Sequence, residues 1–209
     1  MPIRYADDFI ILVASADPDP ERSRALAEQE KVTLGKVLEQ QLGLTLSPEK
    51  TLVTPVTSTM RFLGHHLRVR RHPRHRRLVP RLVIPKERSN RLRRRIETIF
   101  DRSVITETLE NRLQLLNPVL RGWGNFYRHA WGAKRVFAAM DHYVWWTILR
   151  WLRKKHPRTR MRDLAKQYGY HRPRQTALHW RDGDTVPVPL AAIRVRPYGP
   201  GHDPGPVYA

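Results

Sequence analysis

Apolar residues near the start of the chain form two short runs on either side of a pair of acids. Residues 3–6 (IRYA) and 9–15 (FIILVAS) predict two strands, with Asp7 and Asp8 at the turn of a hairpin between them. Because the second run is continuously apolar, it predicts a strand buried on both faces. The pattern therefore places two carboxylates at the tip of an otherwise apolar hairpin.

Further along, the apolar pattern predicts one long helix and then more strands. Residues 17–43 begin with Asp-Pro pairs and end at a glycine, which are typical helix boundaries. Alternating apolar and polar residues over 44–56, 59–70 and 77–85 predict strands, the last two forming a pair. The apolar face of the helix contains Leu26, Leu34, Val37 and Leu38.

From Pro85 onward the apolar positions repeat every three or four residues, which is the helical period. Three such stripes predict three helices packed as a small bundle, and residues 159–169 predict a further short helix. From Gly183 the chain is rich in proline and glycine, which is typical of an extended or mobile segment. The stripes are Leu92, Ile96, Ile99 and Phe100; then Leu109, Leu113, Leu116, Leu120, Trp123 and Tyr127; then Phe137, Met140, Val144, Ile148 and Trp151.

These patterns together predict an α+β protein in three parts. Antiparallel strands with one helix occupy residues 1–84, and a bundle of three helices occupies residues 85–157. A short helix and a Pro/Gly-rich tail occupy residues 158–209.

The net charge of the chain indicates which kind of molecule it binds. There are 39 Lys and Arg against 19 Asp and Glu, a net charge of +20, so we expect a polyanion to bind. Nucleic acid is the first expectation, and an anionic membrane surface the second. The absence of cysteine excludes disulfide scaffolds, Cys-type zinc sites and thiol catalysis. With no apolar run long enough for a membrane span and acids where a signal peptide would be apolar, we expect a cytosolic protein.

Two adjacent acids flanked by apolar strands repel one another, and a bound divalent cation would relieve that repulsion. Asp is also common in turns, which is the simpler explanation of the pair. The functional interpretation is two-metal phosphoryl transfer. In that reaction one Mg²⁺ activates an attacking 3′ hydroxyl and the other neutralises the triphosphate and leaving pyrophosphate.

Four ordered motifs make the functional interpretation more specific. YADD (residues 5–8), LGLTLSPEKT (42–51) and FLGHHL (62–67) resemble the last palm motifs of reverse transcriptases, in their usual order. LNPVLRGWGNFYRHA (116–130) resembles the maturase, or X, region that forms the thumb of group II intron-encoded reverse transcriptases. RWLRKKHP (150–157) resembles the stretch after the third thumb helix, so the resemblance covers residues 3 to 157.

The resemblance implies a partial polymerase palm over residues 1–84 and a thumb, or maturase-specific domain, over residues 85–157. Its implied activities are RNA-directed DNA polymerisation with two Mg²⁺, intron RNA binding and splicing assistance. Its implied partners are group II intron RNA, an RNA/DNA template–primer duplex and dNTP, with no membrane. The implied roles are metal ligand for Asp7, supporting acid for Asp8, contact with the primer end and nucleotide for Tyr5 and Ala6, a catalytic role near the nucleotide for Lys50, and primer grip for Phe62, Leu63 and Gly64.

In the resembled family a further metal-binding aspartate and the fingers precede the YADD motif, which here begins at residue 5. We therefore expect an incomplete two-metal site and no polymerisation by this chain alone. Three explanations of the start stay open: a truncated intron remnant, which we favour, a misassigned start codon, or a missing amino-terminal half supplied as a separate chain.

A belt of positive charge lies between Arg68 and Arg95, where 28 residues contain 13 Lys or Arg and one acid. Its self-repulsion would be relieved by a phosphate backbone through counterion release. Gly122 and Gly124, beside bulky aromatic residues, predict close helix contact or close approach of a ligand. The candidate RNA contacts are Arg68, Arg70, Arg71, Arg74, Arg76, Arg77, Arg88, Arg91, Arg94 and Arg95, followed by Arg121, Asn125, Arg128 and His129.

Two other functions remain beside the reverse transcriptase/maturase fragment. One is a non-enzymatic RNA-binding maturase-like protein with a vestigial palm. The other is an unrelated basic RNA-binding protein with a coincidental YADD, against which the order of the four motifs argues. The ten histidines do not show zinc-ligand spacing, so we expect no zinc site.

Overall fold

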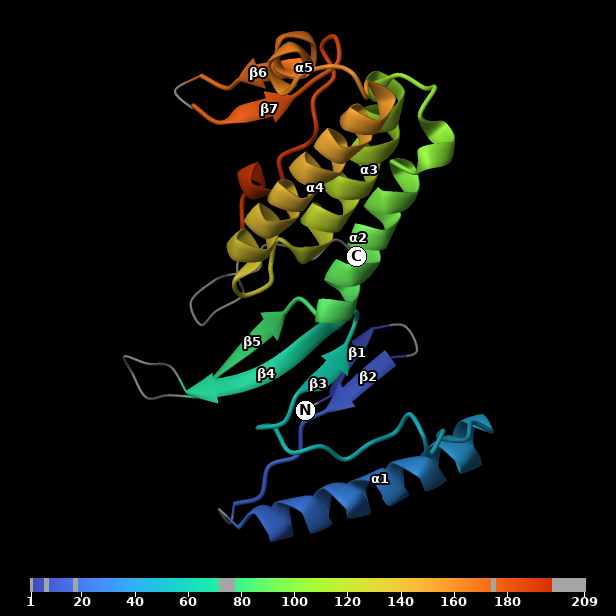
Figure 1. Cartoon of the computed structure of the whole chain (residues 1–209). Helices are drawn as coiled ribbons and strands as arrows, with labels where there is room; N and C mark the ends of the chain where they lie inside the picture. Colours follow the sequence, from blue (N-terminus) through green and yellow to red (C-terminus); the bar gives the residue numbers. More distant parts are fainter. Residues whose placement is uncertain (1, 6–7, 17–18, 72–77, 174–175, 197–209) are drawn as a thin grey trace. The chain divides into compact units, whose positions relative to one another are not determined.

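The computed structural model describes residues 2–5, 8–16, 19–71, 78–173 and 176–196. The chain divides into two compact units, Met1–Leu63 and Gly64–Ala209. The fold is α+β, with short antiparallel strands and five α-helices among the described residues, as the sequence predicts (Figure 1).

The first unit begins with the predicted hairpin. Strand β1 (Pro2–Tyr5) pairs antiparallel with β2 (Asp8–Ile11), and Tyr5 lies opposite Asp8. The expectation that β2 is buried on both faces is wrong, since Phe9 is 40% and Ile11 is 39% exposed. Among the described residues β2 pairs only with β1 in a two-stranded sheet, so no second strand or layer covers its apolar side chains.

Helix α1 (Pro20–Leu42) has the predicted boundaries. The Asp19 carboxylate accepts a hydrogen bond from the Glu21 N–H at 3.0 Å, which caps the first turn. Gly43 ends the helix with φ +63° and donates its N–H to the Glu39 carbonyl. No described residue of α1 is fully buried, so its apolar face is only partly covered within this unit.

The predicted strand over residues 44–56 is absent from the structure, which has irregular backbone and turns there. Pro48 and Pro55 lack the N–H that a strand ladder requires, and the Ser47 carbonyl accepts hydrogen bonds from Lys50 and Thr51 in a local turn. The strand predicted over residues 59–70 is interrupted at Leu63 and Gly64, which have positive φ, so that β3 (Met60–Phe62) ends before them and a second strand begins at His65.

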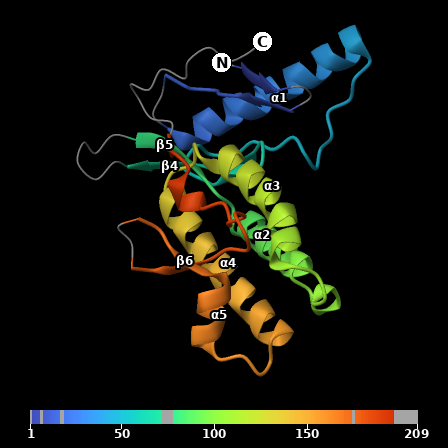
Figure 2. The same ribbon diagram turned by 90° about the horizontal axis from the view of Figure 1, so that it is seen from above.

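The second unit opens with the second predicted strand pair. Strand β4 (His65–Arg71) pairs antiparallel with β5 (Leu78–Val83). Helices α2 (Lys86–Ile99), α3 (Leu109–Tyr127) and α4 (Ala133–Lys155) then lie side by side (Figures 1 and 2).

The core of this unit forms between the three helices. The predicted stripes are buried, with the exception of Trp123, which is half-buried and packs against the core. Leu113, Leu116 and Ile148 have no exposed surface. A helical period of 3.6 residues collects such side chains on one face, so the sequence pattern alone locates this core.

Beyond the bundle, the short 3₁₀ helix η1 (Arg102–Val104) links α2 to α3, and α5 (Met161–Tyr168) leads into β6 (Gly169–His171) and β7 (Leu178–Trp180). The 3₁₀ helix η2 (Leu190–Ala192) follows. Residues 183–196, predicted as part of an extended or mobile segment, have mostly irregular backbone apart from η2; they pack on the bundle, and Leu190 is fully buried. Residues 197–209 lie outside the described residues.

Side-chain amide and carboxylate groups hold this C-terminal stretch in place. Asn117 of α3 accepts a hydrogen bond from the Val188 N–H at 2.8 Å and donates to the Val186 carbonyl at 2.9 Å. Asp141 of α4 accepts from the N–H groups of Leu190 and Ala191, both at 2.8 Å. The buried backbone of an irregular segment is thereby satisfied without a sheet.

Candidate nucleic-acid interface

The β4–β5 hairpin carries arginines in direct opposition. Its register places Arg68 opposite Arg81, and Arg70 lies on the same face two residues along β4. The Arg81 guanidinium lies 4.2 Å from the centroid of the Trp131 ring, a cation–π contact. Like charges facing each other across a sheet are destabilising, so the Arg68–Arg81 pair does not favour the stability of the hairpin.

Helix α2 carries a second group of arginines within the same unit. Arg88, Arg91 and Arg95 follow one another at helical spacing and share a face, with Arg94 beside it. All four side chains are exposed, and among the described residues none forms an ion pair with an acid. Their charge can therefore act on a ligand.

Contacts at the start of β4 fix the hairpin to the end of α3. The Tyr127 hydroxyl donates to the Gly64 carbonyl at 3.2 Å, and the His65 ring stacks on Phe126 with centroids 5.1 Å apart. Burial raises the pKa of Tyr127, so its hydroxyl keeps the proton that it donates. His66 lies 3.8 Å from Glu87 at the start of α2. The arginines of β4, β5 and α2 are thus held on one unit.

The remaining RNA-contact predictions have different surroundings. Arg121 and Asn125 are exposed one turn apart on α3. Arg128 and His129 are half-buried against the C-terminal stretch: the Arg128 carbonyl accepts from the Arg196 N–H at 3.0 Å, and His129 Nδ1 lies 2.9 Å from the Arg196 carbonyl. Arg71 is exposed at the end of β4. Arg74, Arg76 and Arg77 lie outside the described residues.

The predicted polymerase residues belong to the first unit, apart from Gly64, which is the first residue of the second unit. Asp8 is exposed at the start of β2, opposite Tyr5, while Ala6 and Asp7 lie outside the described residues. Lys50 is exposed in the turn that follows Ser47. The predicted primer-grip residues Phe62, Leu63 and Gly64 form the end of β3 and a turn, with φ +46° at Leu63 and +74° at Gly64.

Comparison with known proteins identifies the helical part. Residues 89–169 match the family model described as "Group II intron, maturase-specific domain". This stretch is similar to a group II intron maturase-specific domain. It runs from α2 through α5, the elements that build the buried core, so the predicted maturase resemblance is confirmed.

Two curated relatives match part of the chain. Each is a Group II intron-encoded protein LtrA, one from Lactococcus lactis subsp. cremoris and one from its strain MG1363. Each is 42% identical over 69 residues, which is 33% of this chain and 10% of the relative. The matched stretch thus spans about a tenth of the length of these relatives.

The arginines of β4 and β5 precede the residues matched to the maturase-specific domain, whereas those of α2 lie within or just before them. Sequence reasoning missed Arg81 as a candidate contact. The signal was present, because Arg81 lies in the basic belt, but only the strand register shows that it faces Arg68.

Two Mg²⁺ ions, which the reverse transcriptase resemblance implies, require several carboxylate oxygens in one place. Asp8 supplies hard oxygen ligands of the right kind. Across the part of the chain that the structure describes, no group of three His, Asp or Glu side chains is placed to hold a metal ion. Asp7, the principal predicted ligand, lies outside the described residues.

A helix that spans a bilayer needs about 20 mostly apolar residues. None of the described helices is long and apolar enough to cross one.

Proposed function

We propose that this chain binds group II intron RNA and assists its splicing. The observation that supports this most strongly is the set of exposed arginines on α2, without acidic partners among the described residues, within a unit that is similar in part to a maturase-specific domain. The β4–β5 hairpin of the same unit adds Arg68, Arg70 and Arg81.

The arginines suit RNA for a physical reason. A guanidinium presents a planar fork of donors that matches two phosphate oxygens, and each contact releases condensed counterions from the RNA. The net charge of +20 raises the local concentration of any polyanion. In this proposal the β4–β5 hairpin, α2 and the exposed face of α3 carrying Arg121 and Asn125 bind the RNA backbone, with contributions from Arg128 and His129.

The finer part of the proposal concerns the palm motifs. We propose that Asp7, with Asp8 beside it, derives from the metal-binding turn of a reverse transcriptase palm, with Tyr5, Ala6, Lys50 and the 62–64 turn around the nucleotide and primer. In this proposal the chain alone does not polymerise. A primer-extension assay with the purified chain tests this, and Mg²⁺-dependent cDNA synthesis would refute it.

The RNA proposal is tested by equilibrium binding to two transcripts of equal length. One is a folded group II intron, and the other is the same intron with its helices disrupted by base changes. We expect tighter binding to the folded intron and faster intron splicing at limiting Mg²⁺ when the chain is added. Equal affinity for both transcripts together with no effect on splicing would contradict the proposal.

A further inference from the structure

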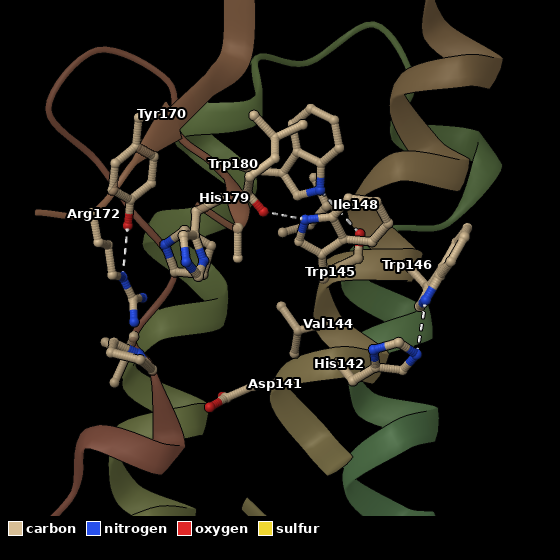
Figure 3. Close-up of a pocket in the computed structure, with 15 residues that line it drawn as sticks. Asp141, His142, Val144, Trp145, Trp146, Ile148, Tyr170, Arg172, His179 and Trp180 are labelled. Atoms are coloured by element: carbon tan, nitrogen blue, oxygen red, sulfur yellow. Dashed lines mark hydrogen bonds between the residues drawn. The ribbon is translucent and has the colours of Figure 1, made fainter. Parts of the chain in front are cut away.

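A cavity of about 510 Å³ lies between α4 and the segment that follows the matched domain. In Figure 3, Tyr170, Arg172 and His179 of the β6–β7 region lie on one side of it and Trp145 of α4 on the other. Val188 and its flanking prolines complete the lining. A volume of this size falls within the range of small-molecule sites.

Hydrogen bonds between its walls hold the cavity open in one shape. Trp145 Nε1 donates to the Leu178 carbonyl at 2.7 Å, and Trp180 Nε1 donates to the Trp145 carbonyl at 3.1 Å. The two indole rings pack with centroids 5.3 Å apart. The Asp141 carboxylate, also in the lining, is occupied by two backbone N–H groups of η2. These bonds pre-form the site, which reduces the ordering that a ligand would have to impose.

The lining combines aromatic faces with positive charge. Tyr170 and His179 pack with ring centroids 5.6 Å apart, and Trp146 is 46% exposed. Arg172 also lines the cavity and donates to the Tyr170 hydroxyl at 3.3 Å. Burial, with Arg172 and His171 nearby, lowers the pKa of His179, so this ring is neutral at physiological pH. The lining thus contains the positive charge of Arg172 and the carboxylate of Asp141, on which the charge of Arg172 also acts.

We propose that this cavity binds an unpaired nucleobase of RNA, stacked on its aromatic lining, with Arg172 contacting the adjacent phosphate. Base faces stack on aromatic side chains, and sequence-tolerant recognition of unpaired nucleotides combines such stacking with cationic groups. An apolar peptide would use the rings but not the arginine, and it would gain nothing from the net positive charge. The inference rests on the proposed RNA-binding function and assigns it a second contact, separate from the arginines of β4, β5 and α2.

Affinities for a single-stranded RNA dodecamer and for a blunt RNA duplex of the same length test the proposal. Tyr170→Leu and Trp146→Leu remove a ring but keep apolar volume, and each should weaken single-strand binding about tenfold while changing duplex binding less than about twofold. Tyr170→Phe and Trp146→Phe keep a ring face and should restore most of the affinity. Phe9→Leu is the matched control, since Phe9 is a ring that is 40% exposed outside the cavity and outside the arginine-bearing elements β4, β5 and α2.

The results of these binding experiments distinguish failure of the proposed RNA-binding function from failure of the cavity inference. If the chain binds neither RNA, the proposed function fails. If it binds both but the cavity variants weaken both equally, or weaken neither, only the cavity inference fails. A cavity that takes an apolar peptide would leave RNA affinity unchanged in all four cavity variants, and this result too would overturn the inference.

Photo-crosslinking supplies an independent readout that does not depend on a variant folding well. A dodecamer carrying 5-iodouridine is irradiated on the full chain, and crosslinked peptides are identified by mass spectrometry. We expect attachment at residues 142–146, 170–172 or 177–180. Attachment confined to β4, β5 and α2 would overturn the cavity inference.

Discussion

Arg68 and Arg81 face each other as direct partners in the register of the β4–β5 pair. Two positive charges at this position repel each other, while Arg81 also stacks on Trp131. A phosphate bound between them would remove the repulsion. We therefore expect a phosphate of the proposed RNA ligand to stabilise the hairpin at the Arg68–Arg81 pair.

Replacing one of these arginines should raise the free energy of unfolding and weaken RNA binding in the same variant. Arg68→Thr removes the like-charge pair and places a good strand former in β4, so the free energy of unfolding should rise by about 0.2–1 kcal/mol. The same variant should bind RNA more weakly. Urea denaturation and RNA titration of the same preparation measure both effects. A variant that is less stable and binds RNA normally would contradict this account.

Gly124 provides a test of the packing of the C-terminal stretch. A Cβ added at Gly124 would lie 2.2 Å from Ile193 Cδ1 and 2.8 Å from Leu190 Cδ2, whereas one added at Gly122 would meet nothing within 4 Å. Gly122→Ala should raise the free energy of unfolding by up to about 1 kcal/mol through helix propensity. The free energy of unfolding of Gly124→Ala should be about 1–3 kcal/mol lower than that of Gly122→Ala.

The two alanine variants share the same gain in helix propensity, so their difference isolates the clash. Adding Ile193→Val to Gly124→Ala should recover part of the stability by making room. Equal denaturation midpoints for the two single variants would show that residues 190–193 do not pack on Gly124.

The sequence allowed the bundle to be predicted but not the course of the chain after it. Leu113, Leu116 and Ile148 belong to long periodic stripes, and each is buried as expected. Trp180 lies in a short segment, and Leu190 follows two prolines in residues 186–190 (VPVPL), so neither belongs to a helical period that indicates a buried face. Leu190 is held by hydrogen bonds from its segment to Asn117 and Asp141, residues about 50 to 70 positions away, and such distant partners leave no local signal.

The same reasoning explains the errors in the first unit. An apolar run such as residues 9–12 predicts burial only if other strands or layers cover it, and the described part of this unit does not supply them. The candidate site was predictable where charge density was high, as on α2. It was not predictable where the strand register determines which residues face each other, as for Arg68 and Arg81. Nor was it predictable where a cavity forms between segments that are distant in the sequence.

The hydrogen bonds of the Asn117 side chain should contribute much of the stability with which residues 183–196 pack on the bundle. Asn117→Ala leaves the Val188 N–H and the Val186 carbonyl without their partner, so the free energy of unfolding should fall by about 1–3 kcal/mol. Limited proteolysis should also cut residues 183–196 faster. Gln114→Ala, at an exposed position of the same helix, should change neither quantity. Matching proteolysis rates for the two variants would exclude the proposed attachment.

His156 should make stability depend on pH. Burial, followed by the charge of Lys155, lowers the pKa of His156 below its ordinary value of 6.5. The unfolded chain therefore binds this proton more readily than the folded chain, and the free energy of unfolding should decrease as the pH falls below about 6.5. In His156→Gln this decrease should be smaller, with the remainder from His179, whose pKa is also lowered. Urea midpoints above and below this pH measure it, and an equal drop in both proteins would contradict the assignment.

The salt dependence of intron RNA binding tests the central claim most directly, because each phosphate contact contributes to the slope of log affinity against log salt concentration. The triple variant Arg88→Gln, Arg91→Gln, Arg95→Gln should bind more weakly than wild type, with a slope shallower by about one for each phosphate that is no longer neutralised. The control is Arg153→Gln, Arg158→Gln, Arg160→Gln, which removes the same charge from exposed positions at the far end of α4 and beyond it. A slope near that of wild type for the control, and a shallower one for the α2 variant, is the predicted result; equal slopes for the two variants would contradict the account.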